Sequence, residues 1–552
     1  MSILKTVQNQ KSRLQSLAIR FQVDRRLSSI SREILRFAKP GSDQNPVAFL
    51  NISSRLGGVS QNAAFTQLTS WGLQLEGIPV IHFVCRSGMS RCVLGTNLDD
   101  HTSPPPCETC IAQSKRLQTS APTYWFNYEP NQNLEDSLEN LSLDELSNYQ
   151  LTIHNSQLPI HGQIIPLGEL TLPSLRWALR RHHLPDDEAT RHQLRQYILS
   201  AYRVAEAFDA FLTEVDPAAI VIFNGLQFPE ATARWVARQH GIRTITHEVS
   251  FQPFSAFFTA GDATAYPIDI PESFDLTPSQ NARLDEYLSQ RIKGEFTMAG
   301  IRFWPEMSGL DEQFLEFAAQ FDQIVPVFTN VVFDTSQIHA NTVFPQMFAW
   351  LDLVLEIIKA QPKTLFVIRA HPDEKRPGTR KQSRESVSDW VICNRVDQLP
   401  NVIFIDSQDY ISSYDLIRRA KFVMVYNSSI GLEATLLDPP VLCGGKARFT
   451  QYPIVHFPQT SAQYQQVAEE FLASEILEVP EEFKRNARRF LYYQLFRVSL
   501  PFDEFLEAHP TPGYVQLKPF SWQDLTTEQS PTMQVLFDGI VDGKPFLLPE
   551  AE

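Results

Sequence analysis

The sequence lacks the features that define several common classes of protein. No run of about 18 apolar residues appears, so we expect no segment that spans a bilayer. Six cysteines among 552 residues are too few for a disulfide scaffold. No apolar stretch follows Lys5 and Lys11, so we expect no secretory signal, and the cytoplasm is the predicted compartment. The net charge of -15 leaves the chain without the basic surface that general binding of nucleic acid requires.

The first forty residues depart from this acidic balance. They contain nine basic residues and two acidic ones, Asp24 and Glu33. Apolar residues recur at roughly helical spacing from Leu14 to Phe37, which predicts a basic amphipathic helix or helix pair over residues 1–40. Such a segment either lies on an anionic membrane surface, at the inner face of the membrane, or packs on the protein with its basic face in solvent.

Beyond residue 40, apolar runs that read as buried strands alternate with segments of helical periodicity. The predicted strands are Pro46–Asn51, Pro79–Val84, Ala218–Phe223, Ile242–His247, Ile324–Asn330, Thr364–Ile368, Val402–Ile405, Phe422–Tyr426 and Pro440–Cys443. This alternation predicts an α/β fold with two Rossmann-like doubly wound domains. Two such domains facing across a cleft resemble the architecture of GT-B glycosyltransferases.

The domain boundaries are placed between these series of strands. The first Rossmann-like domain is predicted over residues 41–275, with an irregular, cysteine-containing insertion at 85–185. A connector over residues 276–320 leads to the second domain at 321–500. Residues 501–552 form a C-terminal tail, which is predicted to pack back on the domains.

Two polar segments follow strands of the second domain, and we expect these strands to be neighbours. The segments run from Arg369 to Pro372 and from Asn427 to Ala434. In an open parallel sheet, ligands bind at the carboxyl ends of the strands, where the first N–H groups of the following helices favour anions. The segments supply an arginine, an imidazole, two hydroxyls, a glycine and a carboxylate: Arg369, His371, Ser428, Ser429, Gly431 and Glu433. Each also has a structural interpretation, as a strand end, a helix cap or a complement to the helix dipole, but their joint placement predicts a receptor for the phosphates of a nucleotide.

The same segments carry a family resemblance. Residues Arg369–Glu374, Ser412–Leu416 and Tyr426–Ala434, with Pro440 and Gly444-Gly445, resemble the carboxyl half of bacterial capsule polysaccharide biosynthesis proteins. That group is similar to the Kdo transferases of capsule assembly and, more distantly, to GT-B sialyltransferases with His-Pro and Ser-Ser/Thr motifs. The resemblance is specific over residues 324–450.

The resemblance implies a donor site in the second domain. The donor would be a nucleotide sugar, for which a CMP-linked sugar is one candidate, and His371, Ser428 and Ser429 would contact its phosphate. Asn330 belongs to the segment that resembles the family's opening strand. Glu433 lies about one helical turn after Ser429, where its carboxylate is expected to accept hydrogen bonds from ribose hydroxyls.

Catalysis must stabilise the charge that develops on a departing phosphate. Metal-dependent transferases often use an Asp-x-Asp motif for this purpose, and the sequence contains none. We therefore predict that catalysis requires no cofactor and that His371 stabilises the leaving group. As the base that deprotonates an acceptor hydroxyl, Glu248, which follows a buried strand, is preferred to Glu230, although either also fits a surface or capping carboxylate. Gly57 and Gly58 are expected to shape the acceptor site by close backbone approach.

These residues predict a metal-independent GT-B glycosyltransferase that transfers a sugar from a nucleotide sugar to a cell-surface polysaccharide or a lipid-linked acceptor. One alternative is a sugar-nucleotide epimerase or a CDP-glycerol-type phosphotransferase on the same fold. A second alternative is a noncatalytic polysaccharide-assembly protein that keeps the fold as a binding platform.

Four cysteines form another constellation, within the predicted insertion. Cys107 and Cys110 make a Cys-x-x-Cys pair, and Cys85 and Cys92 precede them. Fourteen residues separate Cys92 from Cys107, a spacing within reach of a structural zinc site. The wider first pair and the stiff run Pro104–Pro106 speak against a metal, so structural zinc, reduced thiols and a disulfide or redox pair all stay open.

Overall fold

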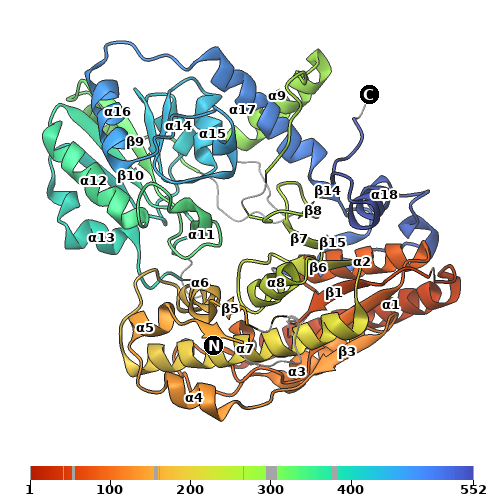
Figure 1. The fold of residues 1–552 in the computed structure, drawn as a ribbon. Coiled ribbons are helices and arrows are strands. Elements are labelled where there is room, and N and C mark those ends of the chain that lie inside the picture. The colour runs from red at the N-terminus through yellow and green to blue at the C-terminus, as the bar shows by residue number, and fades with distance from the viewer. Residues whose placement is uncertain are drawn as a thin grey trace.

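Two separate sheets organise the chain into two α/β domains (Figure 1). The computed structural model describes residues 2–41, 43–52, 56, 58–153, 160, 162–264, 267–293, 307–375, 382–511 and 513–550, with the side chains of residue 19 and of residues 21 onward. Helices cover both faces of each sheet. In Figure 1 the second domain lies at the upper left, and the first domain lies below it and to the right.

Within the described residues, the first sheet has seven strands in the order β14-β8-β7-β6-β1-β2-β3. They are β1 (Val47–Asn51), β2 (Val80–Cys85), β3 (Thr123–Phe126), β6 (Ala219–Phe223), β7 (Thr244–Val249), β8 (Ser255–Thr259) and β14 (Leu500–Pro501). The strands from β3 to β7 along this order pair in parallel, whereas β8 pairs antiparallel with β7 and with β14. The carboxyl ends of the parallel strands, from β3 to β7, therefore lie at one edge of the sheet.

Helices on the two faces of the first sheet define two cores. The helices are α1 (Ser2–Phe37), α2 (Gln61–Leu75), α3 (Cys107–Leu117), α4 (Gln132–Leu138), α5 (Leu143–Ser147), α6 (Leu167–Leu179), α7 (Glu188–Val215) and α8 (Glu230–Gln239). Val47 and Phe49 of β1 face the core shared with α1 and α2, whereas Ala48 and Leu50 face the core shared with α7 and α8. Because successive strand residues point to opposite faces, a sheet buried on both faces needs a continuous apolar run.

The described part of the second domain holds a five-stranded sheet of order β11-β10-β9-β12-β13, in which every pair is parallel. Its strands are β9 (Gln323–Phe328), β10 (Thr364–Arg369), β11 (Val402–Ile405), β12 (Val423–Val425) and β13 (Val441–Cys443). The expectation that β10 and β12 are neighbours is wrong, because β9 lies between them. The chain runs outward from β9 to β10 and β11 and then crosses back to β12. This reversal is the topological switch point, where ligands of open α/β sheets bind.

The helices of the second domain and of its connector are short to medium in length. They are α9 (Pro278–Ile292), α10 (Glu312–Ala318), α11 (Gln337–Ala340), α12 (Met347–Ala360), α13 (Val387–Cys393), α14 (Ser413–Ile417), α15 (Ile430–Thr435), α16 (Ser461–Ala473) and α17 (Glu481–Tyr492). Trp350, Leu351 and Val354 of α12 are fully buried against one face of the sheet. Leu432 of α15 and Phe490 of α17 are buried on the opposite face.

The prediction of an irregular insertion over residues 85–185 is wrong. This region contains α3, α4, α5 and α6, a small ribbon of β4 (Leu151–Thr152) and β5 (Ile164–Ile165), and β3, which pairs in parallel with β2. β3 is four residues long and partly exposed, and α4 and α5 are short, so hydrophobic periodicity is too weak to reveal them. The cysteines consequently lie on a βαβ crossover of the first sheet.

The basic N-terminal segment forms one helix, α1, and the second half of this helix packs on the first domain. Val23, Leu27, Ile30 and Ile34 are buried in the core that they share with α2. The packing interpretation is therefore correct for this half of the helix, and contact with a membrane stays a prediction. Among the described residues, no helix combines the length and the apolar character needed to cross a bilayer.

The C-terminal tail returns from the second domain to the first. After α17 the chain enters β14 and continues through β15 (Leu506–Ala508), β16 (Val515–Leu517) and α18 (Pro531–Phe537). Phe502, Leu525 and Met533 are buried in the core that contains α1 and α2. In Figure 1 this blue segment lies beside the red N-terminal elements. Both ends of the chain thus complete the first domain.

Candidate active site

Three cavities in the described part of the chain share lining residues and therefore lie next to one another. The β10 cavity, of about 320 Å³, is lined by the second domain and the connector. The interdomain cavity, of about 630 Å³, is lined by both domains, and the α8 cavity, of about 540 Å³, lies on its other side. His371, Ser428 and Ser429 line both the β10 cavity and the interdomain cavity, and Asp334 and His339 line both the interdomain cavity and the α8 cavity. The interdomain cavity therefore lies between the other two.

Arg369 is the last residue of β10 and is 2% exposed. Its Nε donates to Ser413 Oγ at 3.1 Å, and its Nη1 donates to the Asp409 carbonyl at 2.9 Å. Its Nη2 is buried with no hydrogen-bond partner among the described residues, and burial lowers the pKa of the guanidinium to about 10. A buried cation with an unused donor at the wall of the β10 cavity is suited to an anionic ligand.

His371 follows β10 by two residues and lies where the β10 cavity meets the interdomain cavity. The backbone N–H of Asp373 donates to its Nδ1 at 3.1 Å. In the neutral ring this contact leaves the proton on Nε2, so the ring can donate a hydrogen bond from the side opposite Nδ1. A donor at this junction can stabilise negative charge on a ligand oxygen.

Ser428 and Ser429 occupy the turn between β12 and α15. In the described turn the side chain of Ser429 makes no capping hydrogen bond to α15, so the interpretation of this serine as an ordinary cap is not supported. Asn330 Nδ2 donates to Asn427 Oδ1 at 2.7 Å, which ties the turn to the segment after β9. Because α15 is only six residues long, its dipole is small, and the hydroxyl and backbone N–H groups are the stronger attraction for an anion here.

Glu433 and Gly431 have structural roles that the sequence does not reveal. The Arg291 Nη2 and Nε atoms lie 2.6 and 2.7 Å from Glu433 Oε1, and the Tyr414 hydroxyl donates to Oε2. Both carboxylate oxygens are thus engaged within the protein, Glu433 also lines the β10 cavity, and the expected contact with a ribose stays a prediction. A Cβ at position 431 would lie 3.1 Å from the side chain of Val425. The close approach at Gly431 is therefore to the core of the domain.

Glu248 lies near the carboxyl end of β7 and lines the same interdomain cavity as His371. Asn62 Nδ2 and Asn224 Nδ2 each donate to its carboxylate at 3.0 Å, and the Val249 N–H donates at 2.9 Å. Burial raises the pKa of Glu248, although these donors act in the opposite direction. A carboxylate with a raised pKa at a cavity wall is suited to accept a proton from a hydroxyl.

Glu230 and Gly58, which were also expected on the acceptor side, lie elsewhere. Glu230 is 8% exposed at the first residue of α8 and is absent from the lining of the three cavities in the described part of the chain. A Cβ at Gly58 would lie 3.1 Å from the ring of Tyr514 in the C-terminal tail, so this glycine permits packing of the tail. Gly57 lies outside the described residues. The geometry favours Glu248 over Glu230 as the base.

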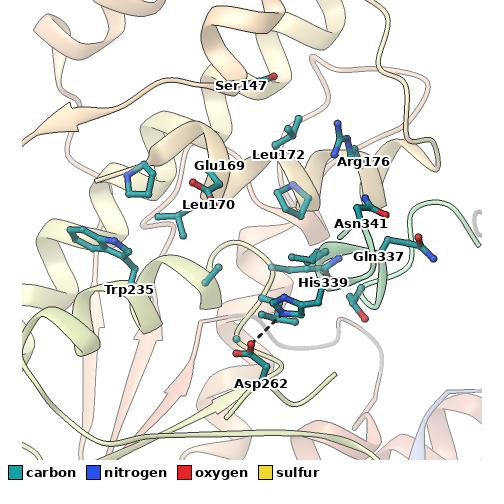
Figure 2. A pocket seen from close by; sticks show the side chains of 18 of the residues that line it. Ser147, Glu169, Leu170, Leu172, Arg176, Trp235, Asp262, Gln337, His339 and Asn341 are labelled. Carbon is teal, nitrogen blue, oxygen red and sulfur yellow. Dashed lines mark ion pairs between the residues drawn. The ribbon is translucent and has the colours of Figure 1, made fainter. Parts of the chain in front are cut away.

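The α8 cavity contains functional groups that the sequence does not single out (Figure 2). Arg176 of α6 and Trp235 of α8 line it, and His339 Nε2 lies 3.3 Å from Asp262 Oδ2 at its edge. Arg176 Nε is buried with no hydrogen-bond partner in the described ranges. In Figure 2 Arg176 and Trp235 lie on opposite sides of the view. No local motif joins these residues, because they come from separate helices and loops.

Cys85, Cys92, Cys107 and Cys110 line one small cavity of about 30 Å³. None of the six cysteines of the chain, all of which the structure describes, forms a disulfide. Burial raises the pKa of the Cys85 and Cys92 thiols to about 12. Among the described residues, no three His, Cys, Asp or Glu side chains are arranged to hold a metal ion. The four cysteines thus converge as thiols, and zinc stays a prediction.

The fold and the site together define a class of protein. Two Rossmann-like domains face each other across the interdomain cavity, and polar residues near the carboxyl ends of strands in both sheets line it. This is the GT-B-like architecture that the sequence predicts.

Within this class, one family is identified for the second domain. Residues 311–470 match the family model described as capsule polysaccharide biosynthesis protein. The matched region runs from the start of α10 into α16 and includes Arg369, His371, Ser428 and Ser429. The resemblance predicted from these segments is confirmed. A search of curated proteins finds no match.

Solved structures align with this chain at low identity. The KpsC beta Kdo 2,4 transferase of Thermosulfurimonas dismutans is 11% identical over 55% of this chain and 84% of its own, with a TM-score of 0.32. The KpsC beta Kdo 2,7 transferase of the same organism is 14% identical over 61% and 90%, with a TM-score of 0.31. UDP-GlcNAc 2-epimerase from Neisseria meningitidis, bound to UDP-GlcNAc, is 11% identical over 81% and 99%, with a TM-score of 0.23. Similarity at this level carries no conclusion about activity.

Proposed function

We propose that the protein is a glycosyltransferase that transfers a sugar from a nucleotide sugar, with CMP-linked sugars as the first candidates, to a growing cell-surface polysaccharide or its lipid-linked precursor. One observation carries the proposal: His371, Ser428 and Ser429 line both the β10 cavity and the interdomain cavity. A nucleotide in the β10 cavity would have its phosphate at this junction and its sugar in the interdomain cavity. The family match over residues 311–470 supports a role in capsule polysaccharide synthesis.

The junction would stabilise the departing phosphate with protein groups alone. Arg369 supplies a positive charge and an unused Nη2 donor among the described residues, and Ser428 and Ser429 supply hydroxyls. His371 would donate a hydrogen bond from Nε2 to a phosphate oxygen as its charge develops. A single donor of this kind typically contributes about 10²- to 10³-fold to kcat.

Glu248 would act from the first domain as the general base. As the bond between the anomeric carbon and the phosphate oxygen breaks, the acceptor oxygen forms a bond to that carbon, and its proton passes to the Glu248 carboxylate. The Asn62 and Asn224 amides that donate to Glu248 fix its orientation toward the shared cavity. The electron pair of the broken bond remains on the phosphate, beside His371 and Arg369.

The acceptor would extend from the interdomain cavity into the α8 cavity (Figure 2). Trp235 offers an aromatic surface for a sugar ring, and Arg176 offers a cation with an unused Nε donor in the described part of the chain. The α8 cavity lies next to the interdomain cavity, so the site has room for two substrates. This room favours a transferase over an epimerase, which needs space for one substrate.

The test of the proposal is turnover of nucleotide sugars by the purified chain and by His371→Ala. We expect release of the nucleotide without added divalent metal, and a loss of about 10²-fold or more in kcat for His371→Ala. His509→Ala is a matched control, because His509 Nδ1 likewise accepts a backbone N–H, from Thr511 at 2.8 Å, on the tail. Equal activity of the two variants would remove His371 from the mechanism.

Product analysis separates the remaining alternatives. An epimerase would convert the donor with no acceptor present, whereas a transferase needs an acceptor for more than slow hydrolysis. A noncatalytic assembly protein would show neither reaction. A panel of CMP, UDP, GDP and their sugars, scored by the rise in Tm, would test binding to the β10 cavity and the preference for a base together.

A further inference from the structure

The segment between β2 and α3 brings together four cysteines that the proposed transfer reaction does not use. Cys85 ends β2, Cys92 precedes a short 3₁₀ turn (Val93–Gly95), and Cys107 and Cys110 lie in the first turn of α3. Their side chains line one cavity together with apolar residues. Cysteines from three separate parts of the chain therefore line the same cavity.

A backbone amide faces the sulfur of Cys85. Cys85 and Cys92 each begin a Cys-x-x-Gly turn, which ends at Gly88 in one case and at Gly95 in the other. The Gly88 N–H donates to Cys85 Sγ at 3.1 Å, and the Gly95 N–H donates to the Cys92 carbonyl oxygen at 3.0 Å. Amide donors to sulfur are typical of the outer shell of metal sites, where they stabilise the thiolate ligands.

Space around these two turns admits no side chain at either glycine. A Cβ at Gly88 would overlap the ring of Phe126, and a Cβ at Gly95 would lie 2.6 Å from Pro105. Glycine therefore allows one turn to pack on Phe126 and the other on Pro105. Pro105 also lines the cysteine cavity.

We propose that Cys85, Cys92, Cys107 and Cys110 bind one structural Zn²⁺ ion. Four sulfur ligands select tetrahedral zinc or an iron–sulfur cluster, and a cavity of about 30 Å³, roughly the volume of one water molecule, fits a single ion. Binding forms four Zn–S bonds and releases the thiol protons to solvent, with no oxidation or reduction. In the described residues the four side chains are not arranged to hold a metal ion, so binding requires a rearrangement of the thiols.

Zinc here would fix a loop that contacts the second domain. Between Cys92 and Cys107 the chain passes Asp99, which lies 2.6 Å from Arg384 Nη2 of the second domain. Arg384 Nη1 also donates to the Leu98 carbonyl at 3.2 Å. A metal that joins the two ends of this loop therefore stabilises a contact across the two domains. The role is structural, since four sulfurs leave no open coordination position.

The experiment measures metal in the full chain purified under reducing conditions. We expect about one zinc per chain, a fall to background in Cys107→Ser/Cys110→Ser, and no change in Cys393→Ser, the matched control at an exposed cysteine. Cobalt added to the metal-depleted wild-type chain should produce the visible bands of a tetrahedral cobalt thiolate, which zinc then displaces. The cobalt measurement uses the wild-type chain, so it tests the proposal even where the double variant does not fold.

Each other outcome overturns the proposal. Metal-free wild-type protein that shows no cobalt bands would mean that the thiols are simply reduced and buried. Stoichiometric iron with sulfide would replace zinc by a cluster. Zinc that persists in the double variant would place the ion elsewhere. These readouts are independent of turnover, so the zinc site and the proposed transferase can fail separately.

Discussion

The interdomain cavity has two walls that are built in different ways. On the side of the second domain, His371 comes from the short segment after β10, and the two serines come from one turn after β12. On the side of the first domain, Glu248 lies near the end of β7, and the side chains that orient it come from Asn62 in α2 and Asn224 after β6. One wall takes its polar groups from two short motifs, whereas the other needs three distant segments to place a single carboxylate.

This difference follows from what each wall has to bind. A phosphate is a compact anion, and a few donors on adjacent turns can surround it. An acceptor glycan is extended and varied, so its site is spread over the α8 cavity through helices and loops that lie far apart in the sequence. We therefore expect substitutions on the two walls to separate into effects on the donor and effects on the acceptor.

The largest expected effect is that of Glu248→Gln. The amide keeps the size of the side chain but cannot accept a proton, so kcat should fall by about 10²- to 10⁴-fold. Donor binding, measured as the rise in Tm with nucleotide, should not change, because the β10 cavity is lined by the other domain. Glu230→Gln is the control and should keep nearly full activity.

If Glu248→Gln and Glu230→Gln lost kcat equally, Glu248 would have no special role in the wall of the first domain. The pH profile gives a second check. Because burial raises the pKa of Glu248, the loss of activity on acidification should begin at a higher pH than for an ordinary carboxylate. In Glu248→Gln this acidic limb should disappear.

Much of the fold could be predicted from the sequence because buried parallel strands are continuous apolar runs. Val402–Ile405 is predicted at the bounds that the structure gives for β11, and the predicted strand Ala218–Phe223 differs from β6 by one residue. β3, with the sequence Thr-Tyr-Trp-Phe, and the two-residue β14 escape prediction because they are short edge elements. The position of β9 between β10 and β12 also could not be read, since sequence order does not determine sheet order.

The site could be predicted only where its residues belong to short motifs in the sequence. His371 and the two serines were accessible through their place after apolar runs, and the structure brings them to one junction. Glu433 shows the limit, because its partner Arg291 lies 142 positions away and no local pattern indicates the pair. Arg176 lies in α6, and Pro173 inside this helix speaks against a helix in the sequence.

The second-largest expected effect comes from breaking the ion pair between Arg291 and Glu433. It tests whether Glu433 on the donor wall has a structural role. The side chains of Arg291 and Glu433 are 14% and 6% exposed, so Arg291→Met leaves a buried carboxylate without its cation. The free energy of unfolding should fall by about 3 kcal/mol, measured with urea. Arg485→Met, which breaks an exposed pair with Asp275, should cost less than about 1 kcal/mol. If Arg291→Met lowers the free energy of unfolding no more than Arg485→Met does, the pair is not structural, and ligand binding becomes the favoured role of Glu433.

Glu374, close to His371 in the same segment, should make the stability of the donor wall depend on pH. Burial raises its pKa to about 8, and among the described residues its Oε2 has no hydrogen-bond partner, whereas the Val387 N–H donates to Oε1 at 2.8 Å. The folded state therefore holds a proton that the unfolded state has lost between about pH 4.5 and 8. Stability should fall across this window as pH rises, by at most about 1.4 kcal/mol per pH unit.

Urea unfolding at several pH values measures this dependence, and the wild-type protein is compared with two variants. Glu374→Gln should flatten the curve, because the amide oxygen still accepts from Val387 and nothing titrates. Glu356→Gln, at an exposed position of α12, should leave the slope of the wild-type protein unchanged. A slope that survives in Glu374→Gln would assign the titration to another group.

The smallest expected effect tests the extended side of the comparison. Arg176→Ala and Trp235→Ala should each raise KM for the acceptor about tenfold, or about 1.4 kcal/mol, because each removes one contact from a site made of many. KM for the donor should stay constant, since neither residue lines the β10 cavity. Arg191→Ala, at a surface ion pair in the same domain, is the control. If the α8 variants instead raised KM for the donor, the long axis of the acceptor would have to lie along another path, and the contrast between a compact donor wall and an extended acceptor wall would no longer hold.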